Sequence, residues 1–157
     1  MKKILCFLCL LAGTLLLTSC SSLPEGAEKP GVKITDLFIT TNNNTPGFEI
    51  GLSVHHNSPG ILPAEALHIE ISLNGRLYAS YDEDDLELQL SPGVTTEIVR
   101  FVPANQAGPA ARDALTYNSM LSADAYCKVQ LLIEDNDEQD LNPEIEYRGI
   151  IYNVLSK

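Results

Sequence analysis

The sequence predicts an all-β fold, an antiparallel β-sandwich of seven or eight strands with one short inserted helix. Short runs in which apolar and polar residues alternate recur from residue 32 onward, and Gly, Pro and Asn separate them. Only the segment 109–121 has a helix-forming composition. Alternation with period two is the pattern of a strand with one buried face, and several such strands separated by turns are typical of a sandwich.

The N-terminal segment, residues 1–19, is predicted to be a signal peptide. Lys2 and Lys3 give it a positive start, and an apolar run follows from Ile4 to Leu17. A helix of that length covers about 21 Å, less than the ~30 Å hydrocarbon core of a bilayer. A short apolar run behind a positive start is the pattern of a secretory signal.

The end of this segment resembles the lipobox of bacterial lipoproteins. Leu17-Thr18-Ser19-Cys20 places one aliphatic and two small residues before a cysteine. The resemblance implies that Cys20 is acylated and becomes the first residue of the mature protein, held at the lipid bilayer by its fatty chains. Ser21 follows, where Gram-negative sorting signals for the inner membrane have Asp. We therefore expect an outer-membrane, lipid-anchored protein on the periplasmic face if the source is Gram-negative.

The charge of the mature chain argues against nucleic acid as a partner. Removing Lys2 and Lys3 leaves eight basic residues against 21 acidic ones, a formal charge of about −13. Such a surface repels nucleic acid and anionic headgroups. The expected partners are the bilayer, through the acylated cysteine, and an envelope protein.

Cysteine content predicts one buried thiol. Cys6 and Cys9 leave with the signal peptide and Cys20 is acylated, so Cys127 alone remains and no intramolecular disulfide can form. Cys127 is in step with Val129 and the apolar residues after it, which predicts a core position.

Residues 20–31 are predicted to be the lipidated cysteine and a flexible tether, because the segment has no periodicity and contains Pro24, Gly26 and Pro30. A chain of this length has a root-mean-square span of roughly 18 Å. Residues 32–155 would then form one domain.

The first half of the domain predicts four strands. The opening strand begins at Val32, and the segments 48–54 and 67–73 alternate apolar with polar residues. Asn74-Gly75 favours a two-residue hairpin turn, since both central positions of a type I′ turn require positive φ. The return strand is expected at 76–81, with a register that the pattern leaves open.

The second half predicts four more strands and the helix. The helix is expected at Pro109–Leu121, which is rich in Ala, begins with Pro and has no further Gly or Pro. The strands are expected at 86–90, 94–102, 127–133 and 145–151.

The order of these segments resembles the late-embryogenesis-abundant (LEA) type 2 family, also called the water stress and hypersensitive response (WHy) domain. Ile34-Thr35-Asp36-Leu37 is similar to its opening strand, 48–54 to its second strand, and 67–76 to its hairpin. This chain departs from the family's Asn-Pro signature: in His56-Asn57-Ser58-Pro59 the asparagine and the proline are separated by a serine. The resemblance implies an immunoglobulin-like or fibronectin-III-like sandwich and a role in desiccation or envelope stress.

Three histidines and one serine are candidates for chemistry. His55 and His56 are adjacent, and neighbours on a strand point to opposite faces, so the two cannot ligate one ion without a bulge. His68 lies on the polar face of another strand and could approach His55. Gly51-Leu52-Ser53-Val54-His55 resembles a nucleophile elbow but has His where the last Gly is needed. Solvated strand residues are the alternative interpretation for all of them.

Two acidic runs are candidates for calcium: Asp82–Asp85 with Glu87, and residues 134–140. Asp135, Asp137 and Asp140 could begin a ring of oxygen ligands. The Gly that lets an EF-type loop turn is missing, so a solvated loop between strands is the favoured interpretation. No catalytic residue, metal or cofactor is predicted.

The leading hypothesis is a membrane-anchored, non-enzymatic module that binds or protects in the envelope. The alternatives are an accessory adaptor of a larger envelope complex, which recognises one partner by an edge strand or its acidic face, and a metal-dependent or hydrolytic enzyme that uses Ser53, His55 or His56. The mature chain lacks HExxH, CxxC and a phosphate-binding glycine loop.

Overall fold

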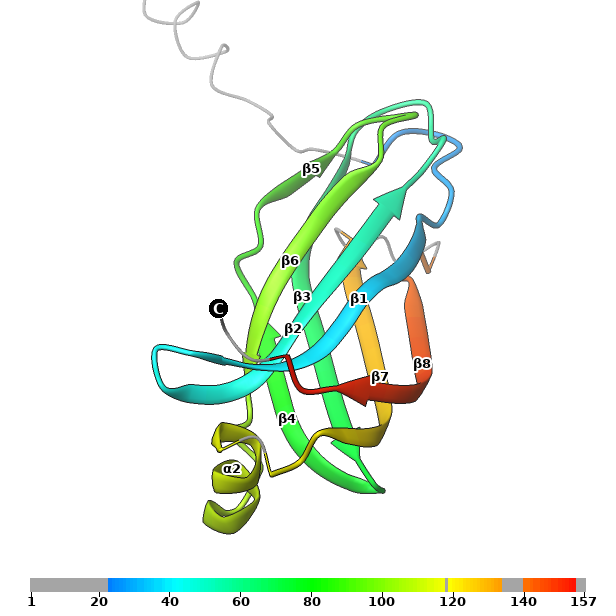
Figure 1. Ribbon diagram of the computed structural model, residues 1–157. Helices are drawn as coiled ribbons and strands as arrows, with labels where there is room; N and C mark the ends of the chain where they lie inside the picture. The colour runs from blue at the N-terminus through cyan, green and yellow to red at the C-terminus, as the bar shows by residue number, and fades with distance from the viewer. Residues whose placement is uncertain (1–22, 118, 134–139, 155–157) are drawn as a thin grey trace, which may run out of the picture.

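The chain folds into two antiparallel β-sheets packed face to face (Figure 1). The computed structural model describes residues 23–117, 119–133 and 140–154. One sheet has the order β1-β2-β6, and the other has the order β4-β3-β7-β8 with β5 also paired to β3. The described strands are β1 (Gly31–Asn42), β2 (Thr45–His55), β3 (Leu62–Leu73), β4 (Arg76–Glu83), β5 (Leu88–Leu90), β6 (Thr96–Pro103), β7 (Ser122–Ile133) and β8 (Glu144–Tyr152). The predicted all-β sandwich is confirmed.

Helix α2 (Pro109–Thr116) crosses between β6 and β7 and is shorter than predicted. The prediction of a helix as far as Leu121 is wrong because a tertiary contact ends it. The Asn153 side-chain amide donates to the carbonyls of Leu115 (3.0 Å) and Met120 (3.2 Å) and turns the chain toward β7. Within the described ranges, no helix is long and apolar enough to cross a membrane.

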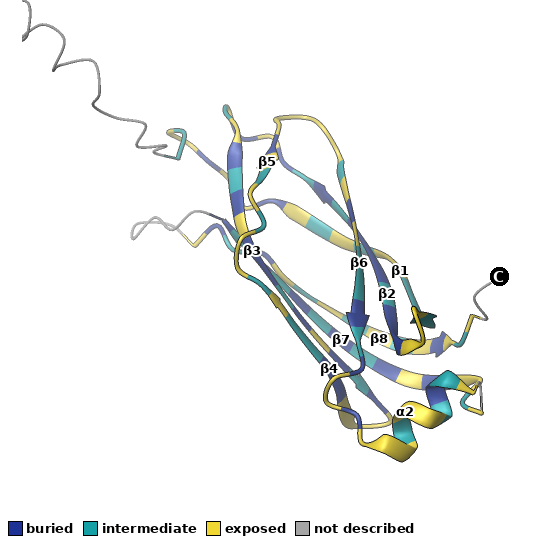
Figure 2. Ribbon diagram, turned by 90° about the vertical axis from the view of Figure 1, so that its left-hand side faces the viewer, coloured by how far each residue is buried: buried dark blue, intermediate teal, exposed yellow. Residues whose placement is uncertain are grey.

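The core lies between the inner faces of the two sheets, and the predicted alternation supplies it. Phe48, Ile50, Leu52 and Val54 of β2 face Leu67, Ile69, Ile71 and Leu73 of β3, and all of them are buried. Figure 2 shows buried residues alternating mainly with partly exposed ones along β2 and β3. Each large apolar side chain buried in this way stabilises the fold by about 1.5–3 kcal/mol.

Cys127 lies in this core, as predicted. Its side chain is fully buried on β7, opposite Ile71 of β3. Burial in apolar surroundings disfavours the thiolate and raises the pKa of the Cys127 thiol to about 12. The thiol is therefore a structural, unreactive group.

The register of the β3–β4 hairpin, which the pattern left open, pairs Ile69 with Tyr81 and Leu67 with Glu83. A bulge lies between Ile71 and Ser72. Tyr81 and Glu83 therefore occupy inward-facing positions on an outer strand of the larger sheet.

The two open sides of the sandwich are closed by different contacts. On one side the end of β8 meets β1, where Val154 N–H donates to the Ile39 carbonyl at 2.8 Å. On the other side, the side-chain amide of Asn105 pairs with both backbone groups of Ser80 on β4, at 3.0 and 2.6 Å. Asn105 thus takes the place of a neighbouring strand at that point and covers part of the β4 edge.

Candidate functional site

The N-terminal segment 23–30 packs on one end of the sandwich. In Figure 1 it is the blue loop beside the connections 57–61 and 91–95, while α2 lies at the opposite end. Ala27 is buried, and its N–H donates to the Pro24 carbonyl at 3.0 Å. Glu28 N–H donates to Ser58 Oγ at 2.9 Å, and Ser58 Oγ donates back to the Glu28 carbonyl at 3.2 Å.

An ion pair adds to this attachment. Lys29 Nζ lies 2.8 Å from Asp140 Oδ2, and the Asn142 N–H donates to Asp140 Oδ1 at 3.0 Å. The ammonium of Lys29, followed by the Asn142 N–H, holds the pKa of the Asp140 carboxyl below its ordinary value. Asp140, a calcium candidate in the sequence, is thus paired with a cation. Asp135 and Asp137 lie outside the described residues.

Residues 23–30 therefore have specific partners in the domain, although the sequence placed them in a flexible tether. Ala27 of the segment is buried, and the partners in the domain are the Ser58 hydroxyl and Asp140, which is 111 positions away from Lys29. Single long-range contacts of this kind leave no periodicity in the sequence. The lipobox, Leu17, Thr18, Ser19 and Cys20, lies outside the described residues.

His55 and His56 have different environments. His55 is half-buried on the outer face of β2, beside a cavity of about 520 Å³ that Lys33 and Ser53 also line, and its Nδ1 has no hydrogen-bond partner. His56 is buried: its Nε2 lies 2.9 Å from the Leu90 carbonyl, and Ser58 N–H donates to its Nδ1 at 3.2 Å. With Nδ1 accepting, Nε2 carries the proton, so the His56 ring holds two connections together.

His68 does not approach His55. It lies on the outer face of β3 in the other sheet, and its Nδ1 is 2.7 Å from Asp82 Oδ1. Throughout the described part of the chain, no group of three or more His, Cys, Asp or Glu side chains is arranged to hold a metal ion. Ser53 lies inside β2, paired with Lys33 on β1 and Glu97 on β6, and not at a strand-to-helix turn.

The first acidic run does not form a single solvated loop. Asp82 and Glu83 are the last residues of β4 and point to opposite faces, Asp82 toward His68 and Glu83 toward Arg100 of β6. Asp84, Asp85 and Glu87, together with Glu65, line an open acidic cavity of about 640 Å³ beside β5. The prediction of a loop over 82–85 is therefore wrong for its first half, because the β3–β4 pairing continues to Glu83.

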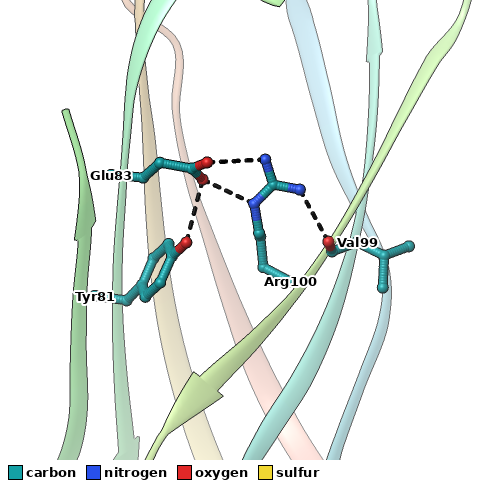
Figure 3. A network of polar contacts seen from close by, with 4 residues as sticks. All are labelled: Tyr81, Glu83, Val99 and Arg100. Carbon is teal, nitrogen blue, oxygen red and sulfur yellow. Dashed lines mark hydrogen bonds and ion pairs between the residues drawn. The ribbon is translucent and has the colours of Figure 1, made fainter. Parts of the chain in front are cut away.

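The pairing of Glu83 with Arg100 was not predicted from the sequence. Arg100 Nε donates to Glu83 Oε2 at 2.7 Å, Nη2 donates to Oε1 at 3.1 Å, and Tyr81 Oη donates to Oε2 at 3.2 Å (Figure 3). The hydrogen bond from Arg100 is the main cause of a lowered Glu83 pKa, and burial is the main cause of a raised Tyr81 pKa. The signal in the sequence is a charged residue at an inward position in each of two outer strands.

Comparison with known proteins gives likenesses of structure. No family model matches the chain, and no curated protein matches its sequence. The solution structure of a "putative late embryogenesis abundant (LEA) protein At2g46140.1" matches with a TM-score of 0.58 and 16% identity, over 79% of this chain and 71% of that chain. The solution structure of AT1g01470 from Arabidopsis thaliana matches with a TM-score of 0.55 and 17% identity, over 89% of this chain and 91% of that chain.

A crystal structure of a protein from Archaeoglobus fulgidus gives a TM-score of 0.50 and 10% identity, over 82% of this chain and 98% of that chain. At identities this low the likenesses concern the fold. They agree with the similarity in segment order between this chain and the LEA type 2 family. The chain therefore has a β-sandwich fold that it shares with a LEA-type structure.

Proposed function

We propose that this chain is an envelope lipoprotein, anchored through Cys20, whose β-sandwich has a non-enzymatic binding or protective role in desiccation or envelope stress. The observation that carries the stress role is the fold shared with the structure described as a LEA protein. The lipobox Leu17-Thr18-Ser19-Cys20 carries the anchoring. The proposed location is the periplasmic face of the outer membrane.

The surroundings of His56 and Ser53, two of the three residues named for the enzyme alternative, favour the non-enzymatic role. Both ring nitrogens of His56 are committed to backbone partners, and Ser53 lies in the middle strand of its sheet. The His56 ring is therefore not free to act as a base, and Ser53 does not lie on the strand-to-helix turn of a nucleophile elbow.

The charge suggests how protection would work. A mature chain with a formal charge of about −13 repels other copies of itself and other acidic envelope proteins. As water is lost and protein concentration rises, such repulsion opposes aggregation. The protective action would depend on total surface charge and little on any one acidic residue.

Survival after drying tests the proposal. A strain without the gene is complemented with the wild-type chain or with the Cys20→Ala variant. The expected result is loss of survival in the deletion strain, restored by wild type and not by Cys20→Ala. Equal survival of all strains after drying and after osmotic shock would overturn the stress role.

An adaptor role is the second candidate, and the outer edge of β8 favours it. This strand ends its sheet, and it exposes Ile150 (56%) and Tyr152 (63%) in its second half. An extended segment of an envelope protein could add to the edge of β8 ahead of Asn153 and Val154, where the chain meets β1. In-cell crosslinking with mass spectrometry distinguishes the two roles: one partner at near-equal stoichiometry, lost in Ile150→Lys, would identify an adaptor, and a diffuse set that grows under osmotic stress would identify a protector.

A further inference from the structure

We propose that the end of the sandwich that carries the N-terminal segment lies directly against the lipid bilayer, with Ile61 and Val94 entering the interfacial layer. This inference rests on the proposed anchoring at Cys20. It adds that the domain has one fixed orientation relative to the membrane and does not rotate freely on a flexible tether.

The reach of the free chain is the first argument. Contacts with the domain begin at Leu23, which packs against the core, and continue through Ala27, Glu28 and Lys29. The ring of Pro24 lies against Gly60, where an added Cβ would stand 3.0 Å from the proline Cβ. Residues 20–22 alone then separate an acylated Cys20 from the docked segment, and three residues span at most about 10 Å.

The composition of the neighbouring connections is the second argument. Residues 57–61 and 91–95 contain no Asp, Glu, Lys or Arg, in a chain with 21 acidic residues. Each exposes a large aliphatic side chain, Ile61 and Val94, at 53% exposure. These two charge-free connections lie beside the exposed Glu25 and Glu28 of the docked segment, and their aliphatic side chains are suited to the boundary between headgroups and acyl chains.

The two connections form one surface because they are tied together. Leu62, the first residue of β3, pairs with Leu90, the last residue of β5. The connection that leads into β3 and the one that follows β5 therefore begin side by side. Gly93 N–H donates to the His56 carbonyl at 2.9 Å, and the His56 ring reaches Leu90. In Figure 1 these connections and the blue segment stand together at the end opposite α2.

A bilayer explains the exposed side chains of Ile61 and Val94 better than a protein partner does. The N-terminal attachment would hold Leu23, the neighbour of the Pro24 that lies against Gly60, within about 10 Å of Cys20 whenever the anchor is inserted. Another exposed apolar pair, Ile150 and Tyr152, lies in the half of β8 that pairs with the start of β7, on the side of α2. It provides a matched control on the same molecule.

The test uses the lipidated full chain in vesicles of phosphatidylethanolamine and phosphatidylcholine. An environment-sensitive fluorophore is attached through Ile61→Cys, Val94→Cys, Val99→Cys or Tyr152→Cys. The native Cys127 is buried and unreactive. The expected result is a blue-shifted emission at 61 and 94, quenched by nitroxide-bearing acyl chains, and a water-like emission at 99 and 152. Water-like emission at all four positions overturns the inference.

A second set of variants removes the aliphatic side chains. With the reporter at Asn57→Cys, the double variant Ile61→Ser/Val94→Ser is expected to lose lipid quenching, and Ile150→Ser/Tyr152→Ser is expected to keep it. All four side chains are exposed, so the fold should tolerate these changes. Acylated protein with no difference between the variants overturns the orientation alone, whereas a chain without acyl groups overturns the anchoring and the orientation together.

Discussion

At the residue scale, the side chains of Glu83 and Arg100 join β4 of one sheet to β6 of the other. Their bidentate contact is partly buried, with side-chain exposures of 25% and 30%. The paired side chains cover the core between β4 and β6, and they place a carboxylate on β4 and a guanidinium on β6. Charges in such positions also discourage edge-to-edge association.

Glu83→Gln is expected to lower the free energy of unfolding by about 1 kcal/mol near pH 7. A carboxyl whose pKa is lowered in the folded state contributes stability above its unfolded-state pKa and loses it as the pH falls through the folded-state pKa. The difference between wild type and variant should therefore shrink below about pH 4.5 and vanish at lower pH. Urea unfolding at a series of pH values measures it. Glu97→Gln, on the exposed face of β6, is the control, and a difference that is independent of pH would contradict the account.

His56→Leu is expected to destabilise the domain by about 2–4 kcal/mol, since it leaves the Ser58 N–H and the Leu90 carbonyl without their buried partner. His68→Leu removes a half-exposed ring that pairs with Asp82 and should cost less than about 1 kcal/mol. Urea unfolding of the two variants compares them directly. Equal losses would show that the His56 contacts do not hold the two connections.

At the element scale, β1 and β2 fit together through one glycine. A bulge between Ile34 and Asp36 places Thr35 beside Gly51, where an added Cβ would lie 2.6 Å from Thr35 Oγ1. Gly51→Ala is expected to cost about 1–3 kcal/mol. The double variant with Thr35→Ala should recover part of that loss. Gly31→Ala, whose nearest contact would be 3.6 Å, is the control and should be tolerated.

A period-two pattern predicted β2 and β3 correctly because one face of each strand is buried and the other is not. The same reasoning could not find the docking of residues 23–30, which depends on the hydroxyl of Ser58 and on Asp140. Local composition also predicted a helix that is too long. Helix α2 ends where the side-chain amide of Asn153 donates a hydrogen bond to the carbonyl of Leu115, 38 positions away. Long-range polar contacts are set by the assembled fold, and local patterns do not encode them.

The candidate site shows the same division. The burial of Cys127 followed from its place in an alternating run, and the different burial of His55, the last residue of β2, and His56, the residue after it, agrees with that alternation. The hydrogen bond of His56 to Leu90 depends on the position of β5 beside β3, which no residue pattern specified.

At the scale of the whole molecule, the two ends of the sandwich differ. One end carries the N-terminal segment and the charge-free connections 57–61 and 91–95. The other carries α2, and the second half of β8 with Ile150 and Tyr152 lies toward it. In the proposed arrangement the first end faces the bilayer, which leaves the second end open to the periplasm.

Intact-mass spectrometry of the protein extracted from the membrane fraction tests the anchoring most directly, with Cys20→Ala as the control. The account predicts a mature chain of residues 20–157 that carries acyl chains on Cys20, and an unacylated product from Cys20→Ala. A wild-type chain that keeps residues 1–19, or one that begins at another residue without acyl groups, would contradict the proposed anchoring.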